Sequence, residues 1–559
     1  MPKIQIDGKP VEVPDGLNLI EAARLLNIEI PHYCYHSGLS VVGSCRMCQV
    51  ELEFNGRKSI ALGCNTLAMD GMQITTTSDE VRRIRRAVLE FYLQHHPLDC
   101  PICDDAGECD LQNYYMEHGL HDSRVDLTEK RHKHKVVDVG PTVVLDSERC
   151  VLCTRCVRFC REIVGKDQLG VYGHGNEAEL MNVPGTKLDN DYAGNVVDLC
   201  PVGALTDKDF RFKRRVWYLK RTPSICTGCS RGCNISIDWE TAHSYKDSGR
   251  RIQRLKPRYN KLVNEWWICD RGRYSYHAVD APNRLLMPFS NAEESEQGVS
   301  VAAVLSRAAA KIEAVIDQNG PASIAVLASA HSSNEDLFML KRLFGEHLKV
   351  QNLDVNLPGE TTGSEDKLLM KSDLAPNRRG AQAIAVKPWG GEGQSGDTIL
   401  EGAREGEFEI LIVVDHDLTQ HLGEKALHKL RKHTGYILYL TAHSNGMSEL
   451  ADDVLPLAMW AERVGTYTNF QGRVQRAAQA FEPLGLAAPE WTYWKELAAL
   501  LGCKCDYKTP HDVFNAIGEH VESFKGLKWD DLGDKGLMLT DTPEPAYRKI
   551  QCPNPLPAY

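Results

Sequence analysis

The sequence predicts an α+β, cysteine-rich N-terminal part followed by an α/β domain with a parallel sheet. Cysteines are concentrated at one end of the chain, because 16 of the 19 fall between Cys34 and Cys269. Beyond about residue 285, short apolar runs alternate with helical patterns, which is typical of α/β folds. The two halves of the chain are therefore expected to fold and to function differently.

The first elements follow from local signals. Residues 3–13 alternate apolar and polar side chains around the turn signal Asp7-Gly8, which predicts a β-hairpin. Asn18 is placed to cap a helix that carries an apolar stripe. A longer helix is predicted over 79–96, where a proline ends it. These patterns predict a small α+β domain at the N-terminus.

The later elements are predicted from buried-strand and helical patterns. We expect buried strands at 323–328, 410–414 and 436–440, and helices at 305–316, 335–347 and 491–501. Residues 376–406 are rich in Gly, Arg and Glu, and we expect a long loop there.

Composition excludes several classes of function. The net charge of −11 and the pI near 6.0 do not fit a nucleic-acid-binding surface. The basic and aromatic run 211–221 is instead expected to contact partner proteins or to offset nearby negative charge. No stretch reaches the roughly 20 apolar residues of a membrane span, and the N-terminus does not resemble a secretory signal. Many cysteines without an export signal predict metal-binding thiolates in place of disulfides.

The first cysteine group, which we call site 1, follows the predicted hairpin and helix. Three thiolates on one loop and a fourth further along can surround a [2Fe–2S] cluster, although the first gap is longer than in plant-type ferredoxins. A zinc site is the alternative. Its residues are Cys34, Cys45, Cys48 and Cys64.

The second group, site 2, contains three closely spaced cysteines that need a fourth ligand. His96 lies directly before a proline at the end of the predicted helix, so its ring can point into the cysteine loop. His95 is the rival ligand, and a plain helix-terminal histidine is the alternative interpretation of His96. The predicted ligands of a [4Fe–4S] cluster are His96, Cys100, Cys103 and Cys109.

The third group, site 3, has the bacterial ferredoxin spacing, in which the fourth cysteine of the run serves a second cluster. That second run is absent here except for Cys200-Pro201, so Cys160 is predicted to be a small buried hydrophobe. The predicted [4Fe–4S] ligands are Cys150, Cys153, Cys156 and Cys200.

The fourth group, site 4, is a tight triplet with a distant fourth cysteine, and it fits a [4Fe–4S] cluster with a zinc ribbon as the alternative. Its residues are Cys226, Cys229, Cys233 and Cys269. Four such groups in this order are far more specific than any one of them. The remaining cysteines, Cys503, Cys505 and Cys552, lack a fourth ligand of suitable spacing.

These motifs, with the stretches HPLDCPIC and CPVGALT, resemble the large (75-kDa-type) iron–sulfur subunit family of proton-pumping NADH:quinone oxidoreductase, respiratory complex I. The segment WAERVGTYTNFQGRVQ (460–475) is similar to molybdopterin-oxidoreductase-like domains. The resemblance covers nearly the whole chain and is strongest over residues 1–275. It implies a β-grasp [2Fe–2S] domain, a helical domain with one histidine and three cysteine ligands, and a bacterial-ferredoxin-like domain. An α/β molybdopterin-oxidoreductase-like domain is expected to follow them.

The domain boundaries expected from this resemblance are 1–78, 79–140, 141–221, 222–278 and 279–505, with a C-terminal tail at 506–559. Many bacterial members are longer, so we expect a C-terminal domain to be absent.

The resemblance also implies a function. Electrons would enter from a flavin on an NADH-binding partner and leave toward the quinone-side iron–sulfur subunits. One [2Fe–2S] and three [4Fe–4S] clusters are expected, without molybdenum or tungsten and without a substrate site on this chain. The expected location is the peripheral arm of the complex, on the cytoplasmic side of a bacterial inner membrane, with membrane contact only through partners.

Two other oxidoreductases are the alternatives. An NAD-linked formate dehydrogenase would need a cysteine or selenocysteine ligand for its metal after site 4, but no cysteine lies between Cys269 and Cys503. The iron–sulfur subunit of a hydrogenase complex is the second alternative, and an iron-only active site would need further cysteine motifs after residue 270.

Overall fold

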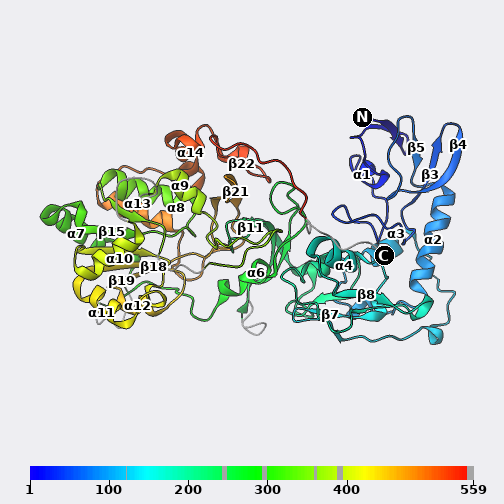
Figure 1. Cartoon of the computed structure of the whole chain (residues 1–559), viewed down its shortest axis with the longest axis horizontal. Coiled ribbons are helices and arrows are strands. Elements are labelled where there is room, and N and C mark those ends of the chain that lie inside the picture. The colour runs from blue at the N-terminus through cyan, green and yellow to red at the C-terminus, as the bar shows by residue number, and fades with distance from the viewer. Residues whose placement is uncertain (121, 242–248, 292–298, 358–361, 387–394, 551–559) are drawn as a thin grey trace. The chain divides into compact units, whose positions relative to one another are not determined.

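The computed structural model describes residues 1–550 except 121, 242–248, 292–298, 358–361 and 387–394. The chain divides into two compact units (Figure 1). Unit 1 is formed by Met1–Leu219 with Ile550, and unit 2 by Lys220–Lys549. None of the described helices is long and apolar enough to cross a bilayer.

Unit 1 begins with a five-stranded sheet and one short helix. Its strand order is β2 (Lys9–Glu12), β1 (Lys3–Ile6), β5 (Gln73–Thr75), β3 (Gln49–Phe54) and β4 (Arg57–Leu62). Strand β1 pairs antiparallel with β2, which confirms the predicted hairpin, and parallel with β5. The side chain of Asn18 accepts a hydrogen bond from the Glu21 amide and so caps α1 (Leu19–Arg24), also as predicted.

The rest of unit 1 consists of short elements joined by long loops. Helix α2 (Asp79–Leu93) ends one turn earlier than predicted. It is followed by α3 (Asp110–His118), α4 (Arg155–Arg158), the π-helical turn η4 (Phe159–Val164) and α5 (Asn195–Leu199). Strands β10 (Leu205–Asp207), β7 (Val143–Leu145) and β6 (Val137–Asp138) form one small sheet, and β8 (Leu169–Tyr172) pairs with β9 (Glu179–Asn182). The loops between these elements carry most of the cysteines.

Unit 2 begins with an antiparallel sheet made of β11 (Lys220–Ile225), β12 (Asn234–Trp239) and β13 (Ile252–Pro257). The short helix α6 (Asp270–Arg273) and the 3₁₀ turn η8 (Ser275–Asp280) follow. A second small sheet contains β20 (Gly465–Thr468), β21 (Arg473–Ala477) and β22 (Leu537–Met538).

The main part of unit 2 is a six-stranded sheet in which only the edge strand β14 is antiparallel to its neighbour. Its order is β14 (Phe289–Ser290), β19 (Asp453–Pro456), β18 (Tyr436–Thr441), β17 (Ile410–Val414), β15 (Ile324–Leu327) and β16 (Asn352–Asp354). The predicted α/β domain with a parallel sheet is therefore confirmed.

Helices cover both faces of this sheet (Figure 1). Along β17, Ile410 and Ile412 belong to one apolar core, whereas Leu411 and Val413 belong to the other. The first core contains side chains of α7 (Val301–Asn319), α8 (Asn334–Leu340), α9 (Arg378–Ile384), α13 (Glu490–Leu500) and α14 (Pro510–His520). The second contains side chains of α10 (Gly396–Glu405), α11 (Glu424–His433) and α12 (Gly446–Leu450).

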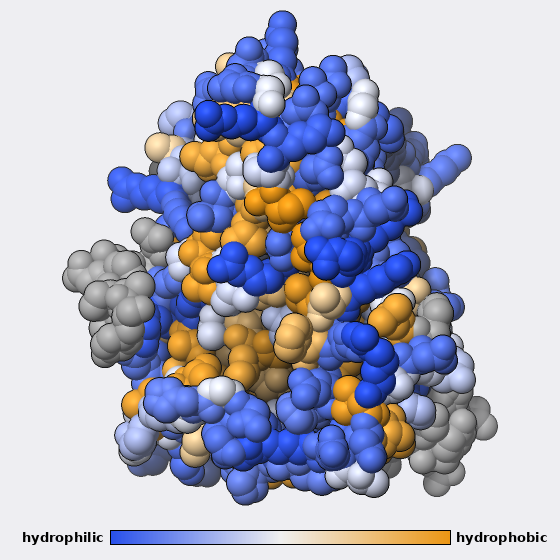
Figure 2. Space-filling view, turned by 90° about the vertical axis from the view of Figure 1, so that its right-hand side faces the viewer, coloured by the Kyte–Doolittle hydropathy of each residue, from blue (hydrophilic) through white to orange (hydrophobic). Residues whose placement is uncertain are grey.

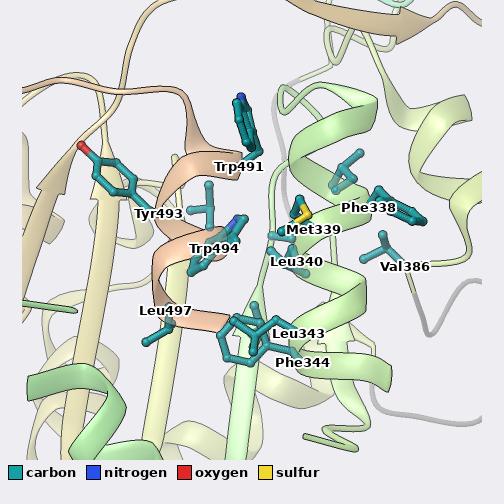
Figure 3. Close-up of a cluster of buried hydrophobic side chains, with 14 of the residues drawn as sticks. Phe338, Met339, Leu340, Leu343, Phe344, Val386, Trp491, Tyr493, Trp494 and Leu497 are labelled. Carbon is teal, nitrogen blue, oxygen red and sulfur yellow. The ribbon is translucent and has the colours of Figure 1, made fainter. Parts of the chain in front are cut away.

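Figure 3 shows the first core where α13 packs against α8 and the following π-helical turn. The rings of Phe344 and Trp494 meet edge to face, with centroids 5.6 Å apart.

Two sequence predictions are wrong for unit 2. The expected loop at 376–406 contains α9 and α10, while residues 387–394 lie outside the described chain. Ser395 caps α10, and Ile399 and Leu400 fill the core, so a few apolar positions outweigh the glycines around them. Residues 506–549 do not form a tail, because Phe514 and Ile517 of α14 are fully buried in the first core.

Candidate metal centres

The cysteines of the described residues are free thiols. In that part of the chain, no group of three or more potential ligands converges closely enough to hold a single metal ion. A cluster distributes its cysteines over several iron atoms, so it does not require such convergence.

At site 1, the sulfurs form two contacting pairs. Cys34 and Cys45 lie on the loop after α1 and share a sulfur–sulfur hydrogen bond, which lowers the pKa of Cys34 to about 5. Cys48, just before β3, makes the same contact with Cys64, just after β4, and this lowers the pKa of Cys64. The Tyr33 amide donates to Cys45 Sγ over 3.4 Å. All four predicted ligands are buried together, with a backbone donor on one sulfur, and so fit an anionic cluster.

At site 2, two of the four predicted ligands, Cys103 and Cys109, are buried, and His96 is half-buried. Burial raises the pKa of Cys103 and raises that of Cys109 to about 12, whereas Cys100 is exposed. Burial lowers the pKa of His96 to about 4, so its ring is neutral, as a metal ligand must be. The ring of His95 is already engaged, because its Nδ1 accepts the Arg131 amide at 3.3 Å. Of the two histidines, His96 fits the ligand role better.

The site 2 loop is held by basic side chains. Arg215 donates to the carbonyl oxygens of Cys103 at 2.5 Å and Pro101 at 2.6 Å. Asp99, directly before Cys100, pairs with the buried Arg149 at 2.7 Å. The basic run 211–221 therefore contributes at least one residue, Arg215, that hydrogen-bonds the cysteine loop of site 2.

At site 3, four cysteines from two distant segments surround one cavity. Its lining consists of Cys150, Cys153, Cys156 and Cys200 together with apolar side chains that include Val171, Leu180, Val202 and Leu205. Burial raises the pKa of all four thiols, to about 12 in Cys150. Cys160 does not line this cavity and is completely buried, as expected of a small hydrophobe. A cavity lined by four cysteines and mostly apolar side chains fits a cubane cluster.

At site 4, a hairpin loop carries three of the cysteines. Cys226 follows β11 and Cys233 precedes β12, and their backbones are joined by a 2.7 Å hydrogen bond. Cys269 caps α6, where its sulfur accepts the Gly272 amide at 3.4 Å. A Cβ on Gly272 would lie 2.8 Å from Cys226 Sγ, so the backbone approaches the sulfurs closely. Burial raises the pKa of Cys226, and raises that of Cys269 to about 11.

These raised pKa values have one chemical consequence. The thiols of sites 3 and 4 whose pKa is raised stay protonated without metal, because a thiolate would be desolvated and would repel its neighbours. Metal binding at these thiols must therefore displace protons.

The remaining cysteines lie far along the chain from the four sites. Cys503 and Cys505 lie with their sulfurs 3.6 Å apart in the segment between α13 and α14, and Cys552 lies outside the described residues.

Several residues of these sites were missed by sequence reasoning. Gly203 is one, because a Cβ there would lie 2.4 Å from Cys103 Sγ. Its signal was present in the CPVGALT stretch, but the close approach is a tertiary contact. The arginines between the cysteines of site 3 are others, since Arg155 and Arg158 are buried and donate to backbone carbonyls.

Family models match along most of the chain. Residues 2–79 match the 2Fe-2S iron-sulfur cluster binding domain, and 85–124 match the NADH-ubiquinone oxidoreductase-G iron-sulfur binding region. Residues 140–206 match the ferredoxin-like domain of NADH-quinone oxidoreductase subunit 3. Residues 219–281 match the molybdopterin oxidoreductase Fe4S4 domain, and 390–500 match molybdopterin oxidoreductase. The chain thus carries 2Fe-2S and 4Fe-4S domains followed by a molybdopterin-oxidoreductase-type domain, which confirms the predicted fold class.

A solved structure with partial sequence similarity is an NAD+-reducing hydrogenase. A chain from a crystal structure of NAD+-reducing [NiFe]-hydrogenase in the H2-reduced state is 31% identical over 38% of this chain and 91% of that chain. The TM-score is 0.34, too low for the two whole folds to be called alike.

Curated relatives align over most of this chain. The G subunit of NADH-quinone oxidoreductase from Rickettsia felis is 31% identical, over 90% of this chain and 88% of that protein. The mitochondrial NADH-ubiquinone oxidoreductase 78 kDa subunit of Candida albicans is 27% identical, over 98% of this chain and 91% of that protein. The mitochondrial NADH dehydrogenase [ubiquinone] iron-sulfur protein 1 of Solanum tuberosum is 39% identical, over 62% and 44% of the two chains. The chain belongs to the family of NADH-quinone oxidoreductase G subunits.

Proposed function

We propose that this chain is the electron-conducting iron–sulfur subunit of an NADH:quinone oxidoreductase. It accepts electrons that originate from NADH at a flavin on a partner subunit and passes them toward quinone, while the whole complex pumps protons. The chain takes part in this oxidoreductase reaction without a substrate site of its own.

The observation that best supports the proposal is the cavity of site 3. Cys200 is 44 positions beyond Cys156 in the sequence, yet both line one enclosed, apolar space with Cys150 and Cys153. Four thiols around a cavity with mostly apolar walls match the ligands and the surroundings of a cubane cluster.

We assign ligands to four clusters on this basis. Site 1 would hold a [2Fe–2S] cluster, and sites 2, 3 and 4 would each hold a [4Fe–4S] cluster, with His96 as the non-cysteine ligand of site 2. Once bound, the clusters supply reversible one-electron oxidation and reduction. The protein's part is to bury the ligands, exclude water and aim backbone amides at the sulfurs, as Tyr33, Gly228 and Gly272 do.

We further propose that unit 1 meets its partners through exposed apolar side chains close to site 2. A cleft there is lined by Leu98, Ile102 and Phe212, all well exposed, and by charged residues that include Lys130 and Arg131. Figure 2 shows that hydrophobic side chains gather in a band on one face. Apolar centres with charged margins are typical of interfaces. The partners would be the flavin-bearing subunit and the quinone-side iron–sulfur subunits, in the peripheral arm of the complex on the cytoplasmic side of a bacterial inner membrane.

Metal analysis of the anaerobically purified chain tests the proposal, followed by EPR of the reduced sample. We expect about 14 iron atoms per chain, matching one [2Fe–2S] and three [4Fe–4S] clusters, with negligible molybdenum, tungsten and zinc. Stoichiometric molybdenum or tungsten would favour a catalytic dehydrogenase such as formate dehydrogenase, and zinc in place of iron would eliminate a redox role.

Two variants make the ligand assignment specific. Cys200→Ala should lose the site 3 EPR signal and about four iron atoms, because it removes a ligand of that cluster. Cys160→Ala, the matched control, should keep both, since Cys160 is outside the cavity. Equal losses in the two variants would refute the site 3 ligand set.

A further inference from the structure

Arg158 joins the loop of site 1 to the loop of site 3. This residue lies on α4 and is 7% exposed. Its Nη2 donates to the carbonyl oxygen of Cys34 at 2.5 Å and to that of Cys153 at 3.3 Å. One guanidinium nitrogen therefore contacts the backbone of a predicted ligand from each of two sites.

The remaining donors of the same side chain are also engaged. Its Nη1 donates to the Ser40 carbonyl at 2.5 Å, and its Nε donates to the Thr154 hydroxyl at 3.4 Å. Every guanidinium nitrogen thus has an acceptor, and two of the four acceptors lie in each loop.

Neighbouring side chains strengthen the same junction. Arg155 donates to the carbonyls of Tyr35 at 2.6 Å and Leu199 at 3.3 Å, residues adjacent to predicted ligands of sites 1 and 3. Glu162 accepts the Ser40 amide at 2.8 Å and also the Ser40 hydroxyl. The junction is therefore built from charge-assisted hydrogen bonds, the stronger kind in proteins, and those of Arg155 and of Arg158 to Cys34 are buried.

We propose that Arg158 is a positioning residue that fixes the separation of sites 1 and 3 and thereby sets electron transfer between them. Electron tunnelling weakens steeply with distance, so a contact that locks the two loops together controls the rate. The buried positive charge also favours the reduced, more negative state of both centres. This inference rests on the proposed function, since it assumes clusters at both sites.

Lysine and glutamine substitutions separate the geometric role from the charge. Arg158→Lys keeps the charge, but an ammonium group cannot reproduce the planar fork of donors. We expect this variant to keep its iron while the magnetic interaction between the reduced clusters of sites 1 and 3 weakens in EPR. Arg158→Gln should also lower the midpoint potentials of both clusters. Arg161→Gln is the matched control, because Arg161 lies on the next turn and pairs with Asp167 at 2.9 Å.

The outcomes distinguish the inference from the function on which it rests. The inference would be overturned if the Arg158→Lys variant showed the same magnetic interaction between the two clusters as the wild type. It would also be overturned if the midpoint potentials of Arg158→Gln shifted no further than those of Arg161→Gln. If neither Arg158 variant retains its clusters, EPR of the reduced wild-type chain provides the test. Clusters at sites 1 and 3 that show no magnetic interaction with each other would then refute the proposed fixed separation. A wild-type chain that binds no iron would instead refute the proposed function itself.

Discussion

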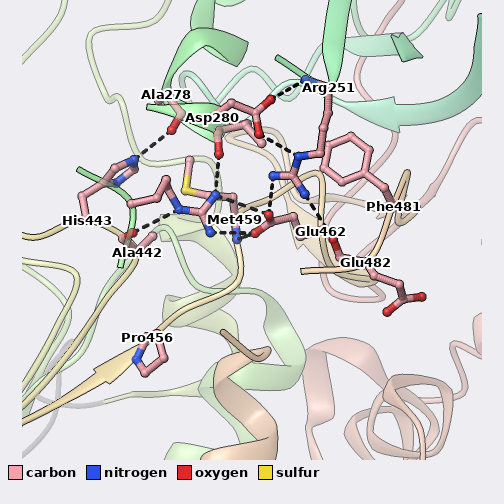
Figure 4. A network of polar contacts seen from close by, with 12 residues as sticks. Arg251, Ala278, Asp280, Ala442, His443, Pro456, Met459, Glu462, Phe481 and Glu482 are labelled. Carbon is pink, nitrogen blue, oxygen red and sulfur yellow. Dashed lines mark hydrogen bonds and ion pairs between the residues drawn. The ribbon is translucent and has the colours of Figure 1, made fainter. Parts of the chain in front are cut away.

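The buried carboxylate of Glu462 allows a quantitative test of how unit 2 is held together. Its two oxygens accept hydrogen bonds from Arg251 at 2.6 Å and from Arg284 at 2.8 Å, and the Met459 amide donates a third at 2.8 Å (Figure 4). Arg251 also pairs with Asp280 at 2.7 Å. The network joins the segment that follows site 4 to the α/β domain.

Glu462→Ala should therefore destabilise unit 2 strongly. The substitution leaves two arginines buried with reduced compensation, and removing one partner of a buried ion pair costs about 3–5 kcal/mol. At about 2 °C per kcal/mol for a domain of this size, the unfolding midpoint should fall by about 6–10 °C. Hydrogen exchange should accelerate first in β13 and η8, which the network anchors.

The assays are thermal unfolding for the midpoint, chemical unfolding for the free energy, and hydrogen exchange read by mass spectrometry for the location of the loss. Glu365→Ala is the matched control, because Glu365 pairs with Lys371 at 2.7 Å on the surface, and it should leave stability unchanged. A loss below about 1 kcal/mol in Glu462→Ala would show that water or neighbouring groups compensate the arginines, and the argument from burial would fail.

The other predictions concern site 2 and a buried acid. Gly203→Ala should abolish the site 2 EPR signal and spare site 3, since its Cβ would lie 2.4 Å from Cys103 Sγ; an unchanged spectrum would contradict this packing. Burial raises the pKa of Glu490 to about 8, so between about pH 4 and 8 the folded state binds more protons than the unfolded state. Unit 2 should consequently lose up to about 1.4 kcal/mol of stability per pH unit as the pH rises through this window. In the Glu490→Gln variant the amide oxygen can still accept the hydrogen bond of Trp494 Nε1, but the side chain no longer titrates. We therefore expect the stability of this variant, measured by unfolding at pH 5 and pH 8, to depend less on pH. If its stability fell as steeply with pH as that of the wild type, another group would be responsible.

Local signals were sufficient for the elements that depend on neighbouring residues. The hairpin at 3–13 and the Asn18 cap form as predicted, because turn and cap chemistry act within a few positions. The order of the six-stranded sheet did not follow from the sequence, because strands with equal hydrophobicity can pair in several orders. The helices within 376–406 and the packed segment after 506 were missed for a related reason, since tertiary burial stabilised them against a polar, glycine-rich composition.

The sequence predicted which cysteines would lie together around the site 3 cavity, but not the side chains that hold the cysteine loops. Cysteine spacing is a local property, so it identified the cavity-lining thiols of site 3 before any fold was known. The contacts of Arg158 and Arg215 with cysteine carbonyls span 124 and 112 positions, and no local pattern encodes such a pairing. The charge of the basic run 211–221 was evident from the sequence, but charge alone does not show whether its side chains contact a partner protein or hydrogen-bond within the chain.

The choice of arginine at these contacts follows from what a cluster loop requires. Such loops are irregular, so their carbonyl groups lack strand or helix partners and must find donors elsewhere. A cluster with thiolate ligands also adds negative charge to a buried place, which a nearby cation offsets. Arginine meets both needs at once, because one side chain offers five donors in a rigid fork and keeps its charge when buried. Arg155 and Arg158 meet both needs at site 3, because each is buried and donates to carbonyl groups of the cysteine loops.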